Sequence, residues 1–408
     1  MKIAFIVGVF PSLSETFILN QITGLLDLGH EVEIFSLMRP TDRKVHDVIE
    51  KRNLMSLVGY FPAIPKNPFL RILKGKFLFF RYFLKHPKRL MKSIRLSGFD
   101  KDILSLKVLF SIIPFLGKDF DIIHCHFGHI GDIGVYIKKG GVQGKLVTTF
   151  YGYDLSTYIL GKGENVYARL FSHGDLFLPI CDYFRKKLIS LSCDESRIRL
   201  YPIGIDLKKH KYILRGRSGK DRVKILTAGR LIEKKGYEYS IRACAVLMKK
   251  GKNFHYTIIG DGPLIKKLTD LVDTLGLNER INFAGGVNRR ELLDYYSKSD
   301  IFLLPSVKSE NGEEEGTPAA LIEAQASGLP VVSSFHSGIP EIVAHEKTGY
   351  LAKEKDSDSI AMYLEMLIDN PGLRLRMGKQ GRKYVEDRFD INRLSRILEG
   401  FYGDLIKG

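Results

Sequence analysis

The sequence lacks an apolar run long enough to cross a membrane, because no segment offers about 18 consecutive apolar residues without a charge. It also lacks the small-residue cleavage site that would make its apolar opening, "MKIAFIVGVF", a secretory signal peptide. The four cysteines, at positions 125, 181, 193 and 244, show no paired spacing, as in proteins of a reducing compartment. We therefore expect a cytoplasmic protein without a membrane span.

Acidic residues are missing from one long stretch. Residues 51–99 contain twelve Lys or Arg and no Asp or Glu, so this stretch supplies most of the formal net charge of +17. Its segment 69–96 interleaves aromatic and aliphatic residues with basic ones, which is typical of a helix that lies on anionic lipid. We expect residues 51–99 to bind an anionic membrane surface, with the protein peripheral on the cytoplasmic membrane.

Two other interpretations of the basic stretch stay open. Single-strand nucleic-acid binders also mix aromatic and basic residues, and an ordinary helical insertion with a solvated face has the same composition. No recognised nucleic-acid-binding fold accompanies the stretch, so nucleic acid is not the expected partner.

Short apolar runs alternate with amphipathic segments along the chain. At 408 residues the chain is too long for one ordinary domain, and two domains of about 200 residues are expected. The first 40 residues predict strand, helix and strand, with Ser14 as the helix N-cap and Gly29 as its C-cap. Further strands are predicted at 121–128, 145–152, 175–180 and 198–205.

The same alternation restarts after residues 202–222, where charge and glycine content rise. Strands are predicted at 223–230, 255–262, 281–286, 301–306 and 329–332, and helices at 236–250, 263–275 and 289–299. The tail, 374–406, is predicted to be helical and amphipathic. Two such blocks predict an α/β fold of two facing, doubly wound, Rossmann-like domains.

The segment "TAGRLIEKKG", residues 227–236, places basic residues directly after a predicted strand. Gly229 permits a sharp turn at the carboxyl end of the sheet, where ligands of such sheets bind. Arg230 offers a planar fork of donors and Lys235 a point charge, which together suit a diphosphate. Taken alone, the segment is equally consistent with a solvated basic loop.

The segment "EEEGTPAALIEAQASGLPVV", residues 313–332, predicts a helix with Thr317 as N-cap, Pro318 at the first helical position and Gly328 as C-cap. The free N–H groups at such a helix start can hold a phosphate. Glu323 begins roughly 7–8 Å along the helix axis, a reach from a phosphate to the hydroxyls of a ribose.

A second glutamate, Glu315, lies outside the helix start, where a sugar on the far phosphate would project. Glu315 and its acidic neighbours also fit a solvated loop. The presence of Arg230 and Lys235 favours the binding interpretation, because a diphosphate site then stands beside the two glutamates.

These segments resemble a known family. "EGTPAALIE", "GRLIEKKG", "IIGDGPL" and "GLPVVSS" are similar to motifs of the retaining GT-B glycosyltransferases of family 4, over nearly all of 222–390. The N-terminal half, with "FPSLSETFILNQITGLLDLGHEVEIFSL", resembles the exopolysaccharide and colanic-acid-type members more loosely. The resemblance implies a GT-B fold with a central cleft, an acceptor domain at 1–204, a nucleotide-sugar domain at 205–384, and a crossover helix at 385–408 that packs back on the first domain.

The resemblance also implies an activity. A sugar would pass from a nucleotide-diphosphate donor, a UDP-sugar or a GDP-sugar, to a saccharide or lipid-linked saccharide acceptor in cell-surface polysaccharide synthesis. Configuration would be retained through attack by the acceptor hydroxyl on the face that the phosphate leaves, without cofactor or metal. The residues implied to bind the donor are Arg230 and Lys235 (diphosphate), Gly316 and Thr317 (phosphates, through backbone N–H), Glu323 (ribose), Val287 (base) and Glu315 (transferred sugar).

The segment "HCHFGH", residues 124–129, is a third candidate site. In a strand His124 and His126 share a face and Cys125 points away, and no second ligand cluster accompanies them, so a zinc site is not expected. The resemblance implies that His126 ends the fourth strand beside the donor sugar and acts with Glu315 as a catalytic residue. A structural histidine in the core is the alternative.

Two further segments depart from the family pattern. In "TFYGYD" Asp154 matches, but Tyr151 stands where similar enzymes often have histidine. The loop "GVFPSLSE" replaces the glycine-rich first loop of many relatives and contains Ser14 and Glu15. We assign these four residues to the acceptor side or to a supporting role.

Other classes of function compete with the transferase. A glycoside hydrolase also uses two carboxylates but needs no diphosphate site. A nucleotide-sugar epimerase of the same architecture needs no acceptor. A non-catalytic basic protein that binds membranes or nucleic acid would tolerate the loss of Glu323 and would bind in a salt-dependent manner.

Overall fold

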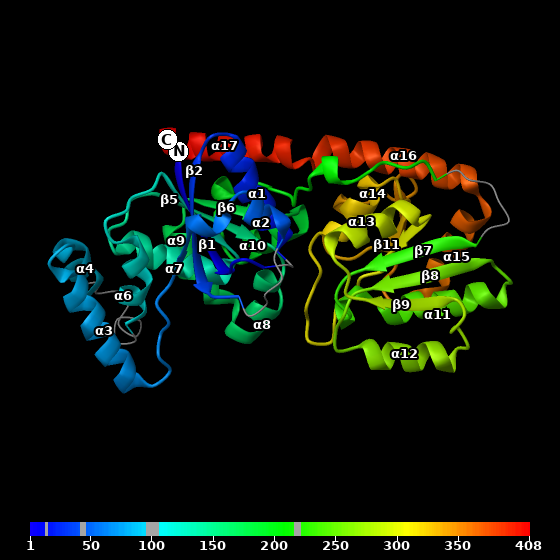
Figure 1. The fold of residues 1–408 in the computed structure, drawn as a ribbon, viewed down its shortest axis with the longest axis horizontal. Helices are drawn as coiled ribbons and strands as arrows, with labels where there is room; N and C mark the ends of the chain where they lie inside the picture. Colours follow the sequence, from blue (N-terminus) through cyan, green and yellow to red (C-terminus); the bar gives the residue numbers. More distant parts are fainter. Residues whose placement is uncertain (13–14, 41–45, 95–105, 216–221) are drawn as a thin grey trace. The chain divides into compact units, whose positions relative to one another are not determined.

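Two six-stranded sheets, in which all strand pairs are parallel, form the centres of two structural units (Figure 1). The computed structural model describes residues 1–12, 15–40, 46–94, 106–215 and 222–408. Unit 1 comprises Met1–Ile180, Arg185–Tyr201 and Leu394–Gly408, and unit 2 comprises Cys181–Phe184 and Pro202–Arg393. The assignment of the two predicted domains to acceptor and donor stays a prediction.

The strands of unit 1 are β1 (Lys2–Val9), β2 (Glu31–Met38), β3 (Val58–Tyr60), β4 (Ile122–His126), β5 (Lys145–Phe150) and β6 (Leu176–Pro179). Those of unit 2 are β7 (Val223–Ala228), β8 (Phe254–Ile259), β9 (Ile281–Gly285), β10 (Ile301–Leu303), β11 (Val331–Ser334) and β12 (Gly349–Ala352). The sheet orders are β3-β2-β1-β4-β5-β6 and β12-β11-β10-β7-β8-β9. Counted within its own unit, each sheet therefore has the doubly wound order 3-2-1-4-5-6, which confirms the predicted α/β fold class.

The helices that lie wholly or mostly in unit 1 are α1 (Thr16–Asp27), α2 (Asp47–Lys51), α3 (Pro68–Phe83), α4 (Pro87–Ile94), α6 (Lys107–Ile112), α7 (Gly128–Lys139), α8 (Thr157–Lys162), α9 (Ala168–His173), α10 (Asp182–Ser190) and α17 (Ile391–Lys407). The second unit has α11 (Tyr237–Lys249), α12 (Ile265–Thr274), α13 (Arg289–Lys298), α14 (Ala319–Ala326), α15 (Ser357–Asp369) and α16 (Pro371–Arg388). Short 3₁₀ turns are η1 (Leu54–Leu57), η2 (Ile113–Phe115), η3 (Tyr153–Leu155), η4 (Glu164–Tyr167), η5 (Glu195–Arg197), η6 (Leu207–Lys209), η7 (Glu233–Lys235) and η8 (Ile339–Glu341).

Each sheet is covered on both faces, as its continuous apolar strands predict. In β7, Ile225 packs into one apolar cluster with residues of α11, α12 and α15. Its neighbour Leu226 packs into another with residues of α14 and α16. Successive side chains of a strand point to opposite faces, so one sheet separates the two clusters. In unit 1, Phe5 of β1 packs with residues of α1 and α17.

Several sequence-based element boundaries are wrong. The predicted strand 198–205 makes only isolated bridges, Phe177 to Ile198 and Ile205 to Asp390, because Pro202 lies within it and has no N–H for a ladder. The predicted tail helix is two helices, α16 and α17, separated by two residues. The short strands β3 and β12 were not expected.

The predicted helix caps are also displaced. Helix α1 has Glu15 as N-cap and Leu28 as C-cap, and α14 ends at the cap residue Ser327. The glycines expected at the two C-caps, Gly29 and Gly328, instead come one position later with φ of 83° each. Glycine is favoured there because a left-handed residue just past a helix end carries no Cβ penalty.

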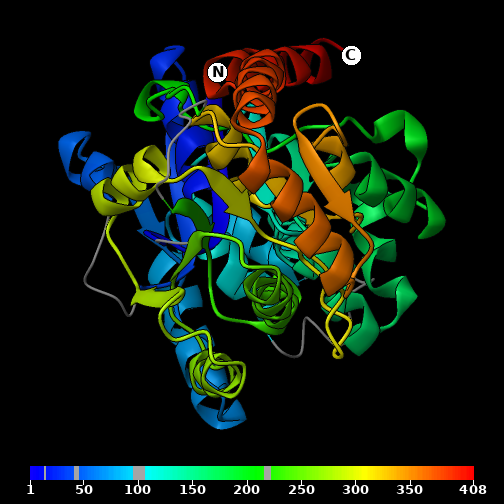
Figure 2. The same ribbon diagram turned by 90° about the vertical axis from the view of Figure 1, so that its right-hand side faces the viewer.

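Helices α3 and α4 form a pair that contacts α6 and is set apart from the sheet of unit 1 (Figure 1). The projection of α3, in blue, is also visible in the second view (Figure 2). Gly75 lets α3 approach α6 closely, because a Cβ at this position would come within 2.5 Å of a Leu106 side-chain carbon. Among the described residues, no helix combines the length and hydropathy that a bilayer crossing needs.

Candidate functional site

The basic loop that follows β7 lies at the carboxyl edge of the second sheet. Gly236 is required there, because its φ is 68° and a Cβ would come within 2.0 Å of the Pro305 carbonyl oxygen. This turn brings Lys235 back, and its ammonium lies 2.7 Å from a carboxylate oxygen of Glu315. The Arg230 side chain is exposed at the same end of β7. The two predicted diphosphate residues thus share one edge, and Lys235 already contacts a predicted sugar residue.

Glu315 is a half-buried and ionised carboxylate. Burial raises its pKa, but Lys235 and then Lys234 oppose that effect, so its pKa lies below the ordinary value. Lys234 also binds Glu313, at 2.6 Å. The Glu315 backbone N–H donates to Nε2 of His336 at 2.9 Å, which fixes the loop in front of α14. The acidic segment is therefore held by ion pairs and is not the freely solvated loop that the sequence left open.

The start of α14 differs from the prediction. Pro318 is the N-cap, with extended ψ of 115°, and its carbonyl accepts from the Leu321 N–H at 3.0 Å. The helix therefore begins at Ala319, and Thr317 as N-cap is wrong. Gly316 and Thr317 are buried beside the helix start, and the Thr317 hydroxyl has no hydrogen-bond partner among the described residues.

Glu323, on α14, is held from two sides. One carboxylate oxygen lies 2.8 Å from the Arg289 guanidinium, and the other accepts from the Tyr296 hydroxyl at 3.2 Å. Arg289 also contacts Nε2 of His210 at 3.0 Å. Burial lowers the pKa of His210 to about 4, so its imidazole is neutral at pH 7 and can accept from Arg289.

Sequence reasoning missed Arg289, Tyr296 and His210. Arg289 opens α13 directly before a second arginine, and no local pattern distinguishes the two. Val287, predicted to lie against the base, is half-buried two residues before α13 and packs on the core of unit 2. The structure thus brings Arg289 to Glu323 and places Val287 close to it in the chain.

His124 and His126 share one face of β4, as predicted, with ring centroids 4.4 Å apart. The ring nitrogens of His124 contact the hydroxyls of Tyr402, at 2.6 Å, and Thr149, at 2.7 Å. The His126 Nδ1 lies 2.8 Å from the Tyr151 hydroxyl, and its Nε2 has no partner among the described residues. Burial lowers the pKa of both histidines, to about 3 for His124, so both are neutral.

Asp154 organises the loop after β5. Its carboxylate accepts from the backbone N–H groups of Gly128, at 2.9 Å, Gly152, at 2.8 Å, and Tyr151, at 3.1 Å. Burial raises the pKa of Asp154, and these hydrogen bonds oppose the rise. Asp154 therefore fixes both the start of α7 and the position of Tyr151, which fits the supporting role.

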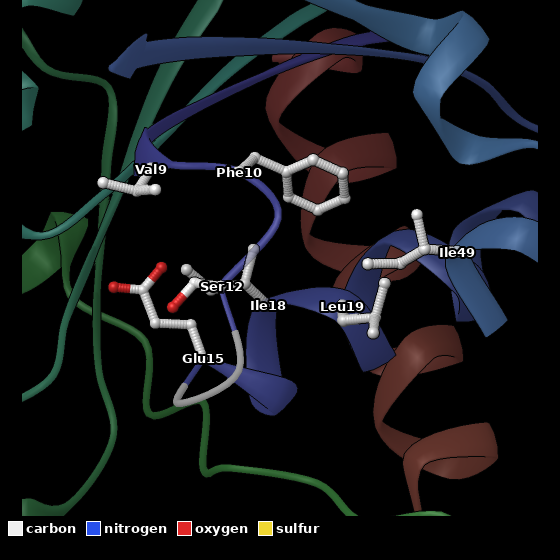
Figure 3. A pocket seen from close by; sticks show the side chains of 7 residues that line it. All are labelled: Val9, Phe10, Ser12, Glu15, Ile18, Leu19 and Ile49. Atoms are coloured by element: carbon white, nitrogen blue, oxygen red, sulfur yellow. The ribbon is translucent and has the colours of Figure 1, made fainter. Parts of the chain in front are cut away.

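Glu15 lines a small pocket beyond the end of β1 (Figure 3). Its carboxylate extends past Ser12 toward Val9, and apolar side chains of α1 and of Phe10 form other parts of the wall (Figure 3). Burial raises its pKa to about 7. The other predicted residue of this loop, Ser14, lies outside the described residues.

The described residues show no cluster of side chains typical of a metal site, and their cysteines are buried. No group of three His, Cys, Asp or Glu side chains in those residues is arranged to hold a metal ion. All four cysteines are buried and free. The predicted site residues at the two sheet edges include Arg230, Lys235 and the Glu315 carboxylate in unit 2, and the neutral side chains of His126 and Tyr151 in unit 1.

Two doubly wound parallel sheets of this order form the GT-B fold. HepE of Anabaena, solved with UDP and glucose, superposes with a TM-score of 0.73 at 16% identity, over 99% of this chain and 100% of that one. The lipopolysaccharide outer core galactosyltransferase WaaB gives a TM-score of 0.69 at 18% identity, over 99% and 100%.

Sequence comparison shows the family. The family description Glycosyltransferase Family 4 matches residues 14–209, and Glycosyl transferases group 1 matches residues 211–384. The chain is 35% identical to the amylovoran biosynthesis glycosyltransferase AmsK of Erwinia amylovora, over 98% of this chain and 99% of that protein. It is 32% identical to WcaL of Escherichia coli, whose name assigns it to colanic acid biosynthesis, over 98% of each. The chain belongs to the family 4, group 1 glycosyltransferases, as its motifs predicted.

Proposed function

We propose that this protein transfers a sugar from a nucleotide-diphosphate donor to a saccharide or lipid-linked saccharide in the synthesis of a cell-surface polysaccharide. The names of AmsK and WcaL support the polysaccharide, and the HepE structures with UDP and UDP-glucose support the donor class. The observation that carries the proposal is the edge of unit 2, where Lys235 meets Glu315 in front of α14 and Glu323 lies within that helix.

In this proposal different residues bind different parts of the nucleotide donor. Lys235 and Arg230 bind the diphosphate, together with the free N–H groups around Gly316 and Thr317 at the start of α14. Negative charge grows on the leaving phosphate during transfer, and fixed cations and N–H groups stabilise it without rearranging. Glu323 accepts from the ribose hydroxyls, and the base lies against Val287.

The proposed mechanism retains configuration. Glu315 and His126 bind hydroxyls of the transferred sugar, and the acceptor hydroxyl attacks on the face that the phosphate leaves, with that phosphate as the base. No metal takes part. The product anomer, determined by NMR, tests retention, and turnover unchanged by EDTA is the expected result for a metal-independent reaction. An inverted anomer or complete loss of turnover in EDTA would contradict the respective part.

A thermal-shift screen tests the donor site. Wild type, Glu323→Ala and Glu279→Gln are compared with UDP, GDP, ADP and their sugar conjugates, where Glu279 is an exposed control. A ligand at 100 times its Kd stabilises by about 2.7 kcal/mol. We expect one nucleotide series to stabilise wild type and Glu279→Gln but not Glu323→Ala. No stabilisation by any nucleotide would contradict the donor site and favour the non-catalytic alternative.

We also propose that α3 and α4 dock this protein on an anionic membrane. Helix α3 carries an apolar stripe that solvent reaches, with Phe77 60% and Phe80 71% exposed, and Leu84 beyond its end is 91% exposed. Such a stripe normally faces a core or another surface. Exposed lysines of the same two helices flank it, as anionic headgroups require. Residues 95–99 of the predicted segment lie outside the described residues.

Vesicle sedimentation tests the docking. The docking variant replaces Lys76, Lys85, Lys88 and Lys92 by Gln, and the control variant replaces four exposed lysines of unit 2, Lys249, Lys266, Lys347 and Lys353. Each lysine near an anionic surface contributes about 1 kcal/mol. The docking variant should no longer sediment with vesicles that contain phosphatidylserine, while the control variant should stay bound to them. Equal binding of both variants would contradict this surface.

A further inference from the structure

Two histidines of β4 stand in similar places but differ in their partners. His124 and His126 each contact a residue that lies 25 positions further along the chain: Thr149, in β5, and Tyr151, directly after β5. His124 has its second ring nitrogen on Tyr402, so both of its nitrogens are satisfied. His126 is equally buried, but its Nε2 has no partner among the described residues. Buried polar groups are nearly always paired, so this nitrogen requires an explanation.

The hydrogens around Tyr151 can be assigned from its contacts. The Gln21 amide, on α1, donates to the Tyr151 hydroxyl oxygen at 3.4 Å. The one hydrogen of the phenol is then free for His126 Nδ1, at 2.8 Å. Burial raises the pKa of Tyr151 well above its ordinary value and lowers that of His126, so the phenol keeps its hydrogen and the imidazole is neutral at pH 7. A neutral imidazole that accepts at Nδ1 carries its hydrogen at Nε2.

The backbone around this pair is also constrained. Phe127, directly after His126, has φ of 74°, a conformation that non-glycine residues seldom adopt and that is often found at functional sites. The centroid of its ring lies 4.8 Å from that of the Tyr151 ring. The centroid of the Phe17 ring lies 4.5 Å from that of the Tyr151 ring. Asp154 holds the Tyr151 N–H, as described above. Tyr151 therefore has a fixed position from which to direct the hydrogen.

We propose that Tyr151 is a positioning residue, which holds His126 as an Nε2–H donor for an oxygen of the transferred sugar. The proposal rests on the proposed function, since the donor sugar supplies the missing acceptor. It explains why tyrosine serves at a position where similar enzymes often have histidine: its hydroxyl is a donor that burial keeps protonated. His124, satisfied at both nitrogens, is the structural counterpart on the same strand.

Nitrogen-15 NMR of histidine-labelled protein tests the tautomer without any ligand, and His126→Gln identifies the signal. We expect the Nε2–H form in wild type and a changed tautomer balance in Tyr151→Phe. Tyr201→Phe is the matched control, because Tyr201 is a buried tyrosine of the same unit whose hydroxyl has no partner among the described residues. An Nδ1–H ring in wild type, or a balance that Tyr151→Phe leaves unchanged, would overturn the proposal.

The rate of donor cleavage tests the functional role of Tyr151. The substrate is the nucleotide sugar that the thermal-shift screen selects. Tyr151→Phe should lower kcat about tenfold, the effect of one lost hydrogen bond, while Kd for the nucleoside diphosphate stays unchanged. Tyr151→His, the residue of similar enzymes, should restore part of the rate. Wild-type kcat in Tyr151→Phe would overturn the positioning role. If no nucleotide binds wild type, the proposed function fails, and the NMR result still decides the tautomer.

Discussion

The edge where β1 and β4 of unit 1 end carries neutral polar side chains, whereas the edge where β7 and β10 of unit 2 end carries paired charges. In unit 1, burial keeps His126 and Tyr151 uncharged, and one hydrogen bond joins them. In unit 2, Lys235 and Glu315 meet as ions at 2.7 Å. The same strand order thus supports two kinds of interaction: a hydrogen bond between neutral side chains in one unit and an ion pair in the other.

The difference has a physical basis. A neutral hydrogen-bonding group distinguishes one hydroxyl orientation from another, and the strength of its hydrogen bond changes little with salt. A lysine recognises a phosphate mainly by charge, which solution ions screen. We therefore expect raised ionic strength to weaken nucleotide binding and to leave the His126 tautomer unchanged.

Removing one cation from the charged edge should have the largest effect. Lys235→Ala should lower donor turnover about 10²–10³-fold, because a fixed charge at the developing phosphate charge is lost. Lys234→Ala is the matched control, since the ammonium of this neighbour lies 2.6 Å from Glu313 and 3.9 Å from Glu315, so its loss should cost much less. Steady-state rates and melting temperatures are measured together. Equal losses of turnover in the two variants would show that charge in the loop, and not the position of Lys235, matters.

Changing Glu15, an acid of the neutral edge, should have an intermediate effect. The pKa of Glu15 is raised to about 7, so the protonated form is the one that the folded state favours. Its contribution to stability is fully present below about 4.5 and is lost as the pH rises through about 7. Glu15→Gln keeps the neutral form, and its stability relative to wild type should rise by about 1–3 kcal/mol between pH 4 and pH 8.

Urea unfolding at a series of pH values measures this difference. Glu164→Gln, at an exposed position of the same unit, is the control and should keep a constant offset from wild type. A Glu15→Gln offset that does not change with pH would mean that Glu15 has the same pKa in the folded and unfolded protein, and the edge of unit 1 would then carry a charge at pH 7.

The smallest effect is expected when Arg289, which contacts Glu323, is replaced. Arg289→Leu removes one of its two partners, and the Kd of the selected nucleoside diphosphate should rise about tenfold. Arg290→Leu, at the next and exposed position of α13, should leave the Kd unchanged. Isothermal titration calorimetry measures both. If the two variants bind the nucleoside diphosphate with the same Kd, the ion pair with Arg289 does not orient Glu323 for binding.

The sequence predicts the fold of this protein well because parallel strands covered on both faces are continuous apolar runs, which stand out locally. It predicts less well where local signals are weak. β3 has three residues, and Pro202 lies in an apolar segment that resembles a strand. Thr317 is a good N-cap residue by type, yet Pro318 takes that place.

The candidate site shows the same division. Lys235, Glu315 and Glu323 could be proposed because motifs place them beside a strand end and a helix start. Arg289 and Tyr296 could not, because they reach Glu323 from another helix and nothing in their neighbourhood distinguishes them. The contact between His126 and Tyr151 likewise joins β4 to the residue that follows β5, and each residue separately gives no indication of it.

The last helix of the chain has a consequence for synthesis. Tyr402 of α17 lies in the core of unit 1 and bonds His124, next to His126, so part of the core of unit 1 is synthesised after every residue of unit 2. Unit 2 ends at Arg393 and has all of its residues earlier. Domains emerging from the ribosome usually fold from the N-terminus onward. In this chain we therefore expect unit 2 to have all of its residues available for folding before unit 1 does, because unit 1 also needs Leu394–Gly408.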